Sequence, residues 1–130
     1  MILLDTHVWL WLNGAAERLS SEVLDLVSSP AANVYLSAAS AWEIGIKVST
    51  GKLTLPAAPT DYIPLRMADN GVKPLPIRHR HALQAAALPL FHKDPFDRLL
   101  IAQAQLEKLK LVTVDRRFAD YDVEILWADK

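Results

Sequence analysis

Residues 1–14, MILLDTHVWLWLNG, begin the chain with an uninterrupted apolar run that ends in an acid. Ile2, Leu3 and Leu4 do not alternate with polar residues, and such a run is typical of a β-strand covered on both faces of a sheet. Asp5 follows the run directly. Ligand sites of open parallel sheets form outside the carboxyl ends of the strands, so Asp5 lies where we expect chemistry.

The same kind of apolar run recurs along the chain. Residues 34–36 (VYL) and 111–114 (LVTV) repeat it most clearly, and weaker candidates lie at 72–75 and 123–126. Helical patterns separate the runs, and strands that alternate with helices predict a parallel sheet between helical layers. We therefore expect an α/β fold, a three-layer α/β/α sandwich with a central, mainly parallel sheet, in one domain over residues 1–130.

One of the intervening segments carries a clear helix signal near the middle of the chain. Ser37 can cap a helix that runs to about Val48. Ala39, Trp42 and Ile46 recur at helical spacing within it, so we expect these three residues to share one face.

A second segment begins with an acid and a proline. Asp94 suits the N-cap of a helix and Pro95 its first position. Apolar residues continue this helix toward a last turn with Lys108 and Lys110, where positive charges favour the helix dipole. A further helix is expected from about residue 60 to 70.

Composition limits the classes of function. The chain has 130 residues, of which 52% are hydrophobic, so it is long enough to form a core without crosslinks. There is no cysteine, which excludes disulfides, thiolate catalysis and cysteine-held metal clusters. We expect a soluble, cytoplasmic protein with no signal peptide and no membrane span. The net charge of −1 gives no global attraction to nucleic acid, so any basic footprint must be local.

Two further acids stand at informative positions. Asp115 directly follows the run at 111–114, as Asp5 follows the first run, so both acids are expected at one edge of the sheet. Glu43 lies in the apolar helical segment SAASAWEIGIK. A carboxylate near an apolar seam needs a cation or hydrogen-bond donors to offset desolvation, although an exposed pair with Lys47 is the alternative.

The helix that begins after Asp94 adds a fourth candidate. We interpret Asp94 as a cap, whereas Asp97 in the first turn can also project toward the strand ends. Clustered carboxylates either raise one another's pKa or bind a cation. Mg²⁺ and Mn²⁺ prefer oxygen ligands and can activate water against a phosphodiester. The sequence therefore predicts a metal site formed by Asp5, Glu43, Asp97 and Asp115.

Four stretches, taken together and in this order, resemble the PIN-domain ribonucleases, and in particular the VapC-like toxins of type II toxin–antitoxin systems. They are ILLDTHVWLW (2–11), SAASAWEIGIKVSTGKL (37–53), DPFDRLLIAQA (94–104) and LVTVDRRF (111–118). The resemblance spans nearly the whole chain. It implies an endoribonuclease dependent on Mg²⁺ or Mn²⁺, in which the same four acids bind the metal and catalyse. Hydrolysis of RNA would leave a 3′-hydroxyl and a 5′-phosphate.

The resemblance also has implications for partners and supporting residues. It implies a homodimer and inhibition by a cognate antitoxin protein that covers the active-site groove. Thr6 would support Asp5 or a metal-bound water, or else cap a helix. Lys47 and Arg98 would orient carboxylates or contact phosphate. Asp94 adds a second acid to its motif without proving that it is a ligand.

Several alternatives stay open. Trp9, Trp11 and Leu12 could form an antitoxin-binding surface, but aromatic and aliphatic residues at this spacing more often form core. The four histidines lack the paired spacing of a transition-metal site, and we interpret them as surface or structural residues. The chain has no glycine-rich phosphate loop. A non-catalytic PIN-like binding module and a housekeeping RNA-processing nuclease are the alternatives to a toxin.

Overall fold

A computed structural model describes the whole chain, residues 1–130, and contains a single five-stranded sheet. The strands are β1 (Ile2–Leu4), β2 (Val34–Ser37), β3 (Lys73–Leu75), β4 (Lys110–Thr113) and β5 (Ile125–Trp127). Their order is β3-β2-β1-β4-β5, and every neighbouring pair is parallel. The expected central sheet is confirmed, and it is parallel throughout.

Six α-helices and two short 3-10 helices connect the strands. The α-helices are α1 (Thr6–Gly14), α2 (Ser21–Ser28), α3 (Ala38–Ser49), α4 (Pro59–Asn70), α5 (His79–Ala87) and α6 (Pro95–Glu107). The 3-10 helices are η1 (Ala16–Arg18) and η2 (Arg116–Asp120). The helices expected after Ser37, near residues 60–70 and after Asp94 are confirmed. None of them combines the length and apolar character that crossing a membrane requires.

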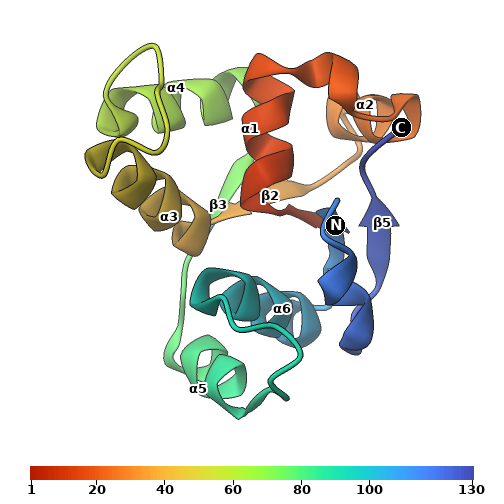
Figure 1. Cartoon of the computed structure of the whole chain (residues 1–130). Coiled ribbons are helices and arrows are strands. Elements are labelled where there is room, and N and C mark those ends of the chain that lie inside the picture. The colour runs from red at the N-terminus through yellow and green to blue at the C-terminus, as the bar shows by residue number, and fades with distance from the viewer.

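The helices cover both faces of the sheet. In β1 the side chains of Ile2 and Leu4 pack into one apolar cluster with residues of α1, α2 and α4, whereas Leu3 packs into a second cluster with residues of α5 and α6. This follows from the alternation of side chains along a strand. Figure 1 shows the two groups of helices on opposite sides of the sheet. The expected three-layer sandwich is therefore confirmed.

The tryptophans of α1 belong to the core. Trp9 is fully buried in the cluster formed with α2 and α4. Trp11 and Leu12 are partly buried and pack against the same cluster. The interpretation as core is confirmed for Trp9, whereas Trp11 and Leu12 lie at the edge of the core.

Helix α3 buries a different face from the expected one. Ser37 caps the helix as expected, and its hydroxyl accepts a hydrogen bond from the backbone N–H of Ala39 at 3.0 Å. Trp42 is 62% exposed, however, and its ring meets Phe96 edge-on. The buried residues of α3 are Ala39, Ser40, Glu43 and Ile44. Of the three apolar residues expected on one face, Ala39 is buried and Trp42 and Ile46 are exposed, because the side of α3 that packs inward also carries polar residues, which hydrophobic periodicity does not register.

Helix α6 ends earlier than expected. Its last residue is Glu107, and Lys108 turns the chain with a φ of 57°. Lys110 already pairs with β1 as the first residue of β4. The expected helical turn containing Lys108 and Lys110 is wrong. Lys110 pairs with β1 and therefore has an extended backbone, so the helix must end before it.

The conformation of Lys108 gives a prediction about stability. It is the one non-glycine residue with a positive φ, and its side chain is exposed. Glycine reaches this conformation without the steric cost of a Cβ atom. We expect Lys108→Gly to raise the free energy of unfolding by about 0.5–1 kcal/mol, as measured by urea denaturation. Lys108→Ala keeps the Cβ atom and serves as the control, so it should not gain this stability. A Lys108→Gly protein less stable than the wild type would contradict the proposed backbone strain at Lys108.

Candidate active site

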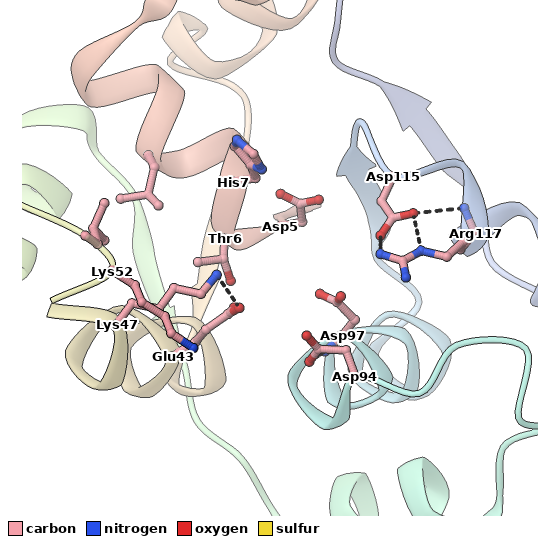
Figure 2. A pocket seen from close by; sticks show the side chains of 12 residues that line it. Asp5, Thr6, His7, Glu43, Lys47, Lys52, Asp94, Asp97, Asp115 and Arg117 are labelled. Carbon is pink, nitrogen blue, oxygen red and sulfur yellow. Dashed lines mark hydrogen bonds and ion pairs between the residues drawn. The ribbon is translucent and has the colours of Figure 1, made fainter. Parts of the chain in front are cut away.

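The four predicted acids meet in one pocket at the carboxyl edge of the sheet. The pocket has a volume of about 380 Å³ and is lined by 12 residues, which include all four acids and Asp94. Asp5 follows β1, Glu43 lies on α3, Asp97 lies in the first turn of α6 and Asp115 follows β4. Figure 2 shows these four side chains around a common space, each supplied by a different element.

Asp5 is the most enclosed of these acids and is 5% exposed. It is the N-cap of α1, where one carboxylate oxygen accepts a hydrogen bond from the backbone N–H of Val8 at 2.8 Å. The other oxygen accepts a hydrogen bond from the hydroxyl of Thr113 on β4. Burial raises the pKa of Asp5, and these two hydrogen bonds oppose that rise only in part.

Asp97 is the acid most affected by its neighbours. Burial raises its pKa to about 8, and surrounding negative charges contribute to this rise. Those charges belong to Asp94, Asp5, Glu43 and Asp115. The carboxyl group of Asp97 therefore holds its proton to a higher pH than an ordinary aspartate does.

The pKa of Asp115 is shifted in the opposite direction, below its ordinary value. It caps η2, and Arg117 donates to it three times: from the backbone N–H at 3.0 Å, from Nε at 3.0 Å and from Nη2 at 2.7 Å. The guanidinium group of Arg117 holds the pKa of Asp115 low, at about 2. Asp115 is thus ionised, and its negative charge contributes to the raised pKa of Asp97.

Glu43 has one paired and one unpaired oxygen. Its side chain is buried although Lys47 ion-pairs with Oε2 at 3.0 Å. The other oxygen, Oε1, is buried and has no hydrogen-bond partner. Leaving a carboxyl oxygen buried without a partner is costly, and a bound cation or a water molecule at this atom would remove that cost. The Glu43–Lys47 pair forms, but only Lys47 is exposed to solvent. The alternative of a fully exposed pair is therefore wrong.

The donor set suits a hard divalent cation. The pocket presents carboxylate oxygens from several sides, and one of these, Oε1 of Glu43, has no other partner. Mg²⁺ and Mn²⁺ bind through such oxygens. A cation would also relieve the mutual repulsion that raises the pKa of Asp97.

Two residues of the site were not singled out in the sequence. Thr113 donates to Asp5 and accepts from the backbone N–H of Asp115 at 3.0 Å, and so links the two acids. Its position two residues before Asp115 in a strand was the available signal, because such residues point to the same side. His92 is buried with Nε2 at 3.0 Å from Asp97 Oδ2 and 3.1 Å from Asp115 Oδ2. In the sequence, only the position of His92 two residues before the DPFD motif could have indicated that it lies beside these acids.

Thr6 and Lys47 take roles that the structure can specify. Thr6 lines the pocket, but its hydroxyl donates to Ser40 on α3 at 2.8 Å. The cap of α1 is Asp5, so the capping role suggested for Thr6 is wrong. Lys47 contacts the carboxylate of Glu43, as the resemblance implied.

Arg98 points away from the pocket. Its buried guanidinium group donates to backbone carbonyl oxygens of the segment before α6, those of Ala85, Leu88, Pro89 and His92. The expectation that Arg98 orients a carboxylate or contacts phosphate is wrong. One residue along a helix turns the side chain by about 100°, so Arg98 faces this segment while Asp97 faces the pocket.

Basic side chains surround the acids despite the net negative charge of the chain. His7, Lys47, Lys52 and Arg117 line the same pocket. Figure 2 shows Lys47 beside Glu43 and Arg117 beside Asp115. Basic side chains are thus concentrated locally beside the acids, although the net charge gives no global attraction to nucleic acid.

Comparison with known proteins gives one family and one curated relative. The family model described as "PIN domain" matches residues 2–124. The chain is 39% identical over 67 residues to "Ribonuclease VapC16" of Mycobacterium tuberculosis (strain ATCC 25618 / H37Rv). The match covers 52% of this chain and 48% of the relative, so the chain spans about half the length of that protein.

Solved structures share the fold over nearly the whole chain. One is described as the VapBC2 complex of Rickettsia felis bound to a DNA fragment from its promoter, with 15% identity, a TM-score of 0.75 and coverage of 99% of this chain and 100% of that chain. The toxin–antitoxin complex of Klebsiella pneumoniae gives 18% identity, a TM-score of 0.68 and coverage of 98% and 97%. FitAcB of Neisseria gonorrhoeae gives 25% identity, a TM-score of 0.65 and coverage of 98% and 97%.

The raised pKa of Asp97 predicts a stability that depends on pH. Its folded pKa of about 8 lies above the ordinary value of 3.8, so the folded state binds the extra proton and metal-free protein loses stability as pH rises from about 4 to 8. In EDTA at pH 8 we expect Asp97→Asn to be more stable than the wild type by about 2–4 kcal/mol, and by much less at pH 4.

Urea denaturation at the two pH values measures this difference. Asp25→Asn, at an exposed position on α2, is the control and should follow the wild type. Adding Mn²⁺ should stabilise the wild type and leave Asp97→Asn largely unchanged, because only binding to the folded state adds stability. An Asp97→Asn protein less stable than the wild type in EDTA at pH 8 would contradict the proposed repulsion.

Proposed function

Because the chain belongs to the PIN-domain family, we propose that it is a metal-dependent endoribonuclease and the toxin of a toxin–antitoxin pair. The observation that carries the catalytic part is the pocket, which is lined by four carboxylates from four elements, one of which, Glu43, has a buried oxygen without a partner. The name of the relative, a ribonuclease, supports RNA as the substrate.

The proposed metal is Mg²⁺ or Mn²⁺. The residues that would hold it are Asp5, Glu43, Asp97 and Asp115. A bound ion of this kind lowers the pKa of a water molecule and stabilises the charge on the leaving oxygen of a phosphodiester. Water attacks phosphorus and the bond to the 3′ oxygen breaks, so the products carry a 3′-hydroxyl and a 5′-phosphate.

The chain's own side chains orient the acids and receive the substrate. Thr113 fixes Asp5 against β4, and Lys47 holds one oxygen of Glu43. Lys47, Lys52 and Arg117 on the rim of the pocket offer donors to phosphate oxygens of RNA. These contacts read no base, so they support binding of the backbone without setting a sequence preference.

The proposed protein partner is a cognate antitoxin. Structures of the same fold are described as toxin–antitoxin or VapBC complexes, which supports this assignment. Inhibition would follow if the antitoxin covers the acidic pocket. The homodimer implied by the resemblance stays a prediction. A housekeeping nuclease would share the chemistry, and a small neighbouring gene whose product blocks cleavage would favour the toxin.

The proposed activity is tested with purified, antitoxin-free protein and a labelled pool of structured RNA. We expect cleavage with Mg²⁺ or Mn²⁺, none in EDTA, and a loss of about 100-fold or more in Asp5→Asn and Asp97→Asn, because each removes a metal-holding charge. Asp25→Asn is the matched control with an exposed acid.

Two results would count against the proposal. Cleavage that both pocket variants retain would place the activity elsewhere. Wild-type protein that binds Mn²⁺ but cleaves no RNA would favour the non-catalytic binding module.

A further inference from the structure

His92 is the buried histidine of the site, and a backbone contact defines its protonation. It lies in the segment between α5 and α6 and is 2% exposed. Its Nδ1 accepts a hydrogen bond from the backbone N–H of Asp94 at 3.2 Å. A nitrogen that accepts carries no proton, so in the neutral ring Nε2 carries it.

The N–H at Nε2 donates a hydrogen bond to one carboxylate of the pocket and lies close to a second. Nε2 lies 3.1 Å from Asp115 Oδ2, which accepts its hydrogen bond, and 3.0 Å from Asp97 Oδ2. One donor therefore lies between an acid from α6 and an acid that follows β4.

Surrounding residues fix the position of His92. Its backbone N–H donates to the Tyr121 hydroxyl at 2.8 Å, and that hydroxyl donates to the carbonyl of Pro89 at 2.6 Å. Arg98 donates to the carbonyl of His92 at 3.2 Å. The ring also packs against Phe118, with 5.6 Å between ring centroids. The buried Arg98, which contacts no acid, thus has a structural task in holding this segment.

We propose that His92 is a positioning residue, whose Nε2–H holds Asp97 and Asp115 together in the arrangement that binds the cation, without itself binding the metal. This inference rests on the proposed function of the pocket. Two carboxylates repel each other, and a donor between them lowers the cost of keeping them close. Partners that orient metal-binding carboxylates typically change affinity by about 10–100-fold when they are removed.

Direct metal ligation by His92 is the competing role. One ligand atom from each of His92, Asp97 and Asp115 lies within 4.8 Å of the others, so distance alone permits it. A ligating nitrogen must offer a lone pair, however, and the contact from Asp94 already uses the lone pair of Nδ1. A positioning role requires the proton on Nε2, whereas direct ligation through Nε2 requires that this nitrogen has lost it, so the tautomer distinguishes the two roles.

The chain contains a matched control for His92. His81 is buried as well, its Nδ1 accepts from the backbone N–H of Arg78 at 2.9 Å, and its Nε2 lies 3.0 Å from Glu107 Oε2. The hydrogen-bond pattern is the same and neither histidine lines the pocket, but the acid beside His81 is Glu107, which lies outside the pocket, whereas the acids beside His92 line it. Each imidazole is buried and lies between a backbone N–H and a carboxylate, and only His92 contacts the proposed metal-binding acids.

The first test is the tautomer itself, measured by ¹⁵N NMR of histidine-labelled protein. The positioning role predicts that Nε2 of His92 is protonated in metal-free protein and keeps its proton at saturating Mg²⁺. Loss of the Nε2 proton on addition of Mg²⁺ would overturn the proposal in favour of direct ligation.

The second test is Mn²⁺ affinity, measured by titration with the unbound ion detected by electron paramagnetic resonance. We expect His92→Phe and His92→Asn to bind Mn²⁺ about 10–100-fold more weakly, because neither places an N–H between the two acids. His92→Gln, whose longer amide reaches the position of Nε2, should stay within a few-fold of the wild type. His81→Phe should bind as the wild type does.

These outcomes separate the role of His92 from the proposed function. Equal Mn²⁺ affinity in His92→Asn, His92→Gln and wild-type protein would overturn the positioning role and leave the nuclease intact. Wild-type protein that binds no Mn²⁺ would overturn both. If His92→Phe does not fold, the Mn²⁺ affinities of His92→Asn and His92→Gln test the positioning role: the role predicts weaker binding by His92→Asn, and equal affinities contradict it.

Discussion

Electrostatic repulsion among carboxylates in one small pocket is the constraint on which the rest of the site depends. It is one cause of the pKa of about 8 for Asp97, and the surrounding residues compensate for it in different ways. Asp115 is paired with Arg117, Glu43 with Lys47, and Asp5 with Thr113 and the start of α1. The compensation is incomplete, since one oxygen of Glu43 has no partner. A divalent cation would compensate for the remaining negative charge. Without the cation, the repulsion among the acids destabilises the folded protein.

The topology of the sheet brings these acids together. The chain runs from β1 outward to β2 and β3, and then returns to the other side of β1 to form β4 and β5. The order of strands therefore reverses between β1 and β4, and ligands of doubly wound sheets bind at such a point. Asp5 and Asp115 follow these two strands, while α3 and α6 supply Glu43 and Asp97 beside them. Side chains 110 positions apart in the sequence thus line one pocket.

Local patterns were sufficient to predict the acids but not their supporting residues. Asp5 and Asp115 follow buried strands, and Asp97 stands in the first turn of a capped helix, so strand ends and caps located them. Thr113 and His92 contact acids 108 and 23 positions away, and Arg98 contacts carbonyl oxygens of the segment before α6, so no periodicity encodes these contacts. Hydrophobic periodicity alone does not give the buried side of α3, because Glu43 is buried and Trp42 is exposed. Functional sites are where local hydrophobic rules are expected to fail.

The central claim is that the four carboxylates form one cation site. Anomalous X-ray diffraction from crystals soaked in Mn²⁺ tests it most directly, because the signal locates the ion without reference to activity. The account predicts an anomalous peak in the pocket, in contact with carboxylate oxygens that include those of Asp5 and Asp97. An empty pocket at saturating Mn²⁺, or a peak only at other surface acids, would contradict it.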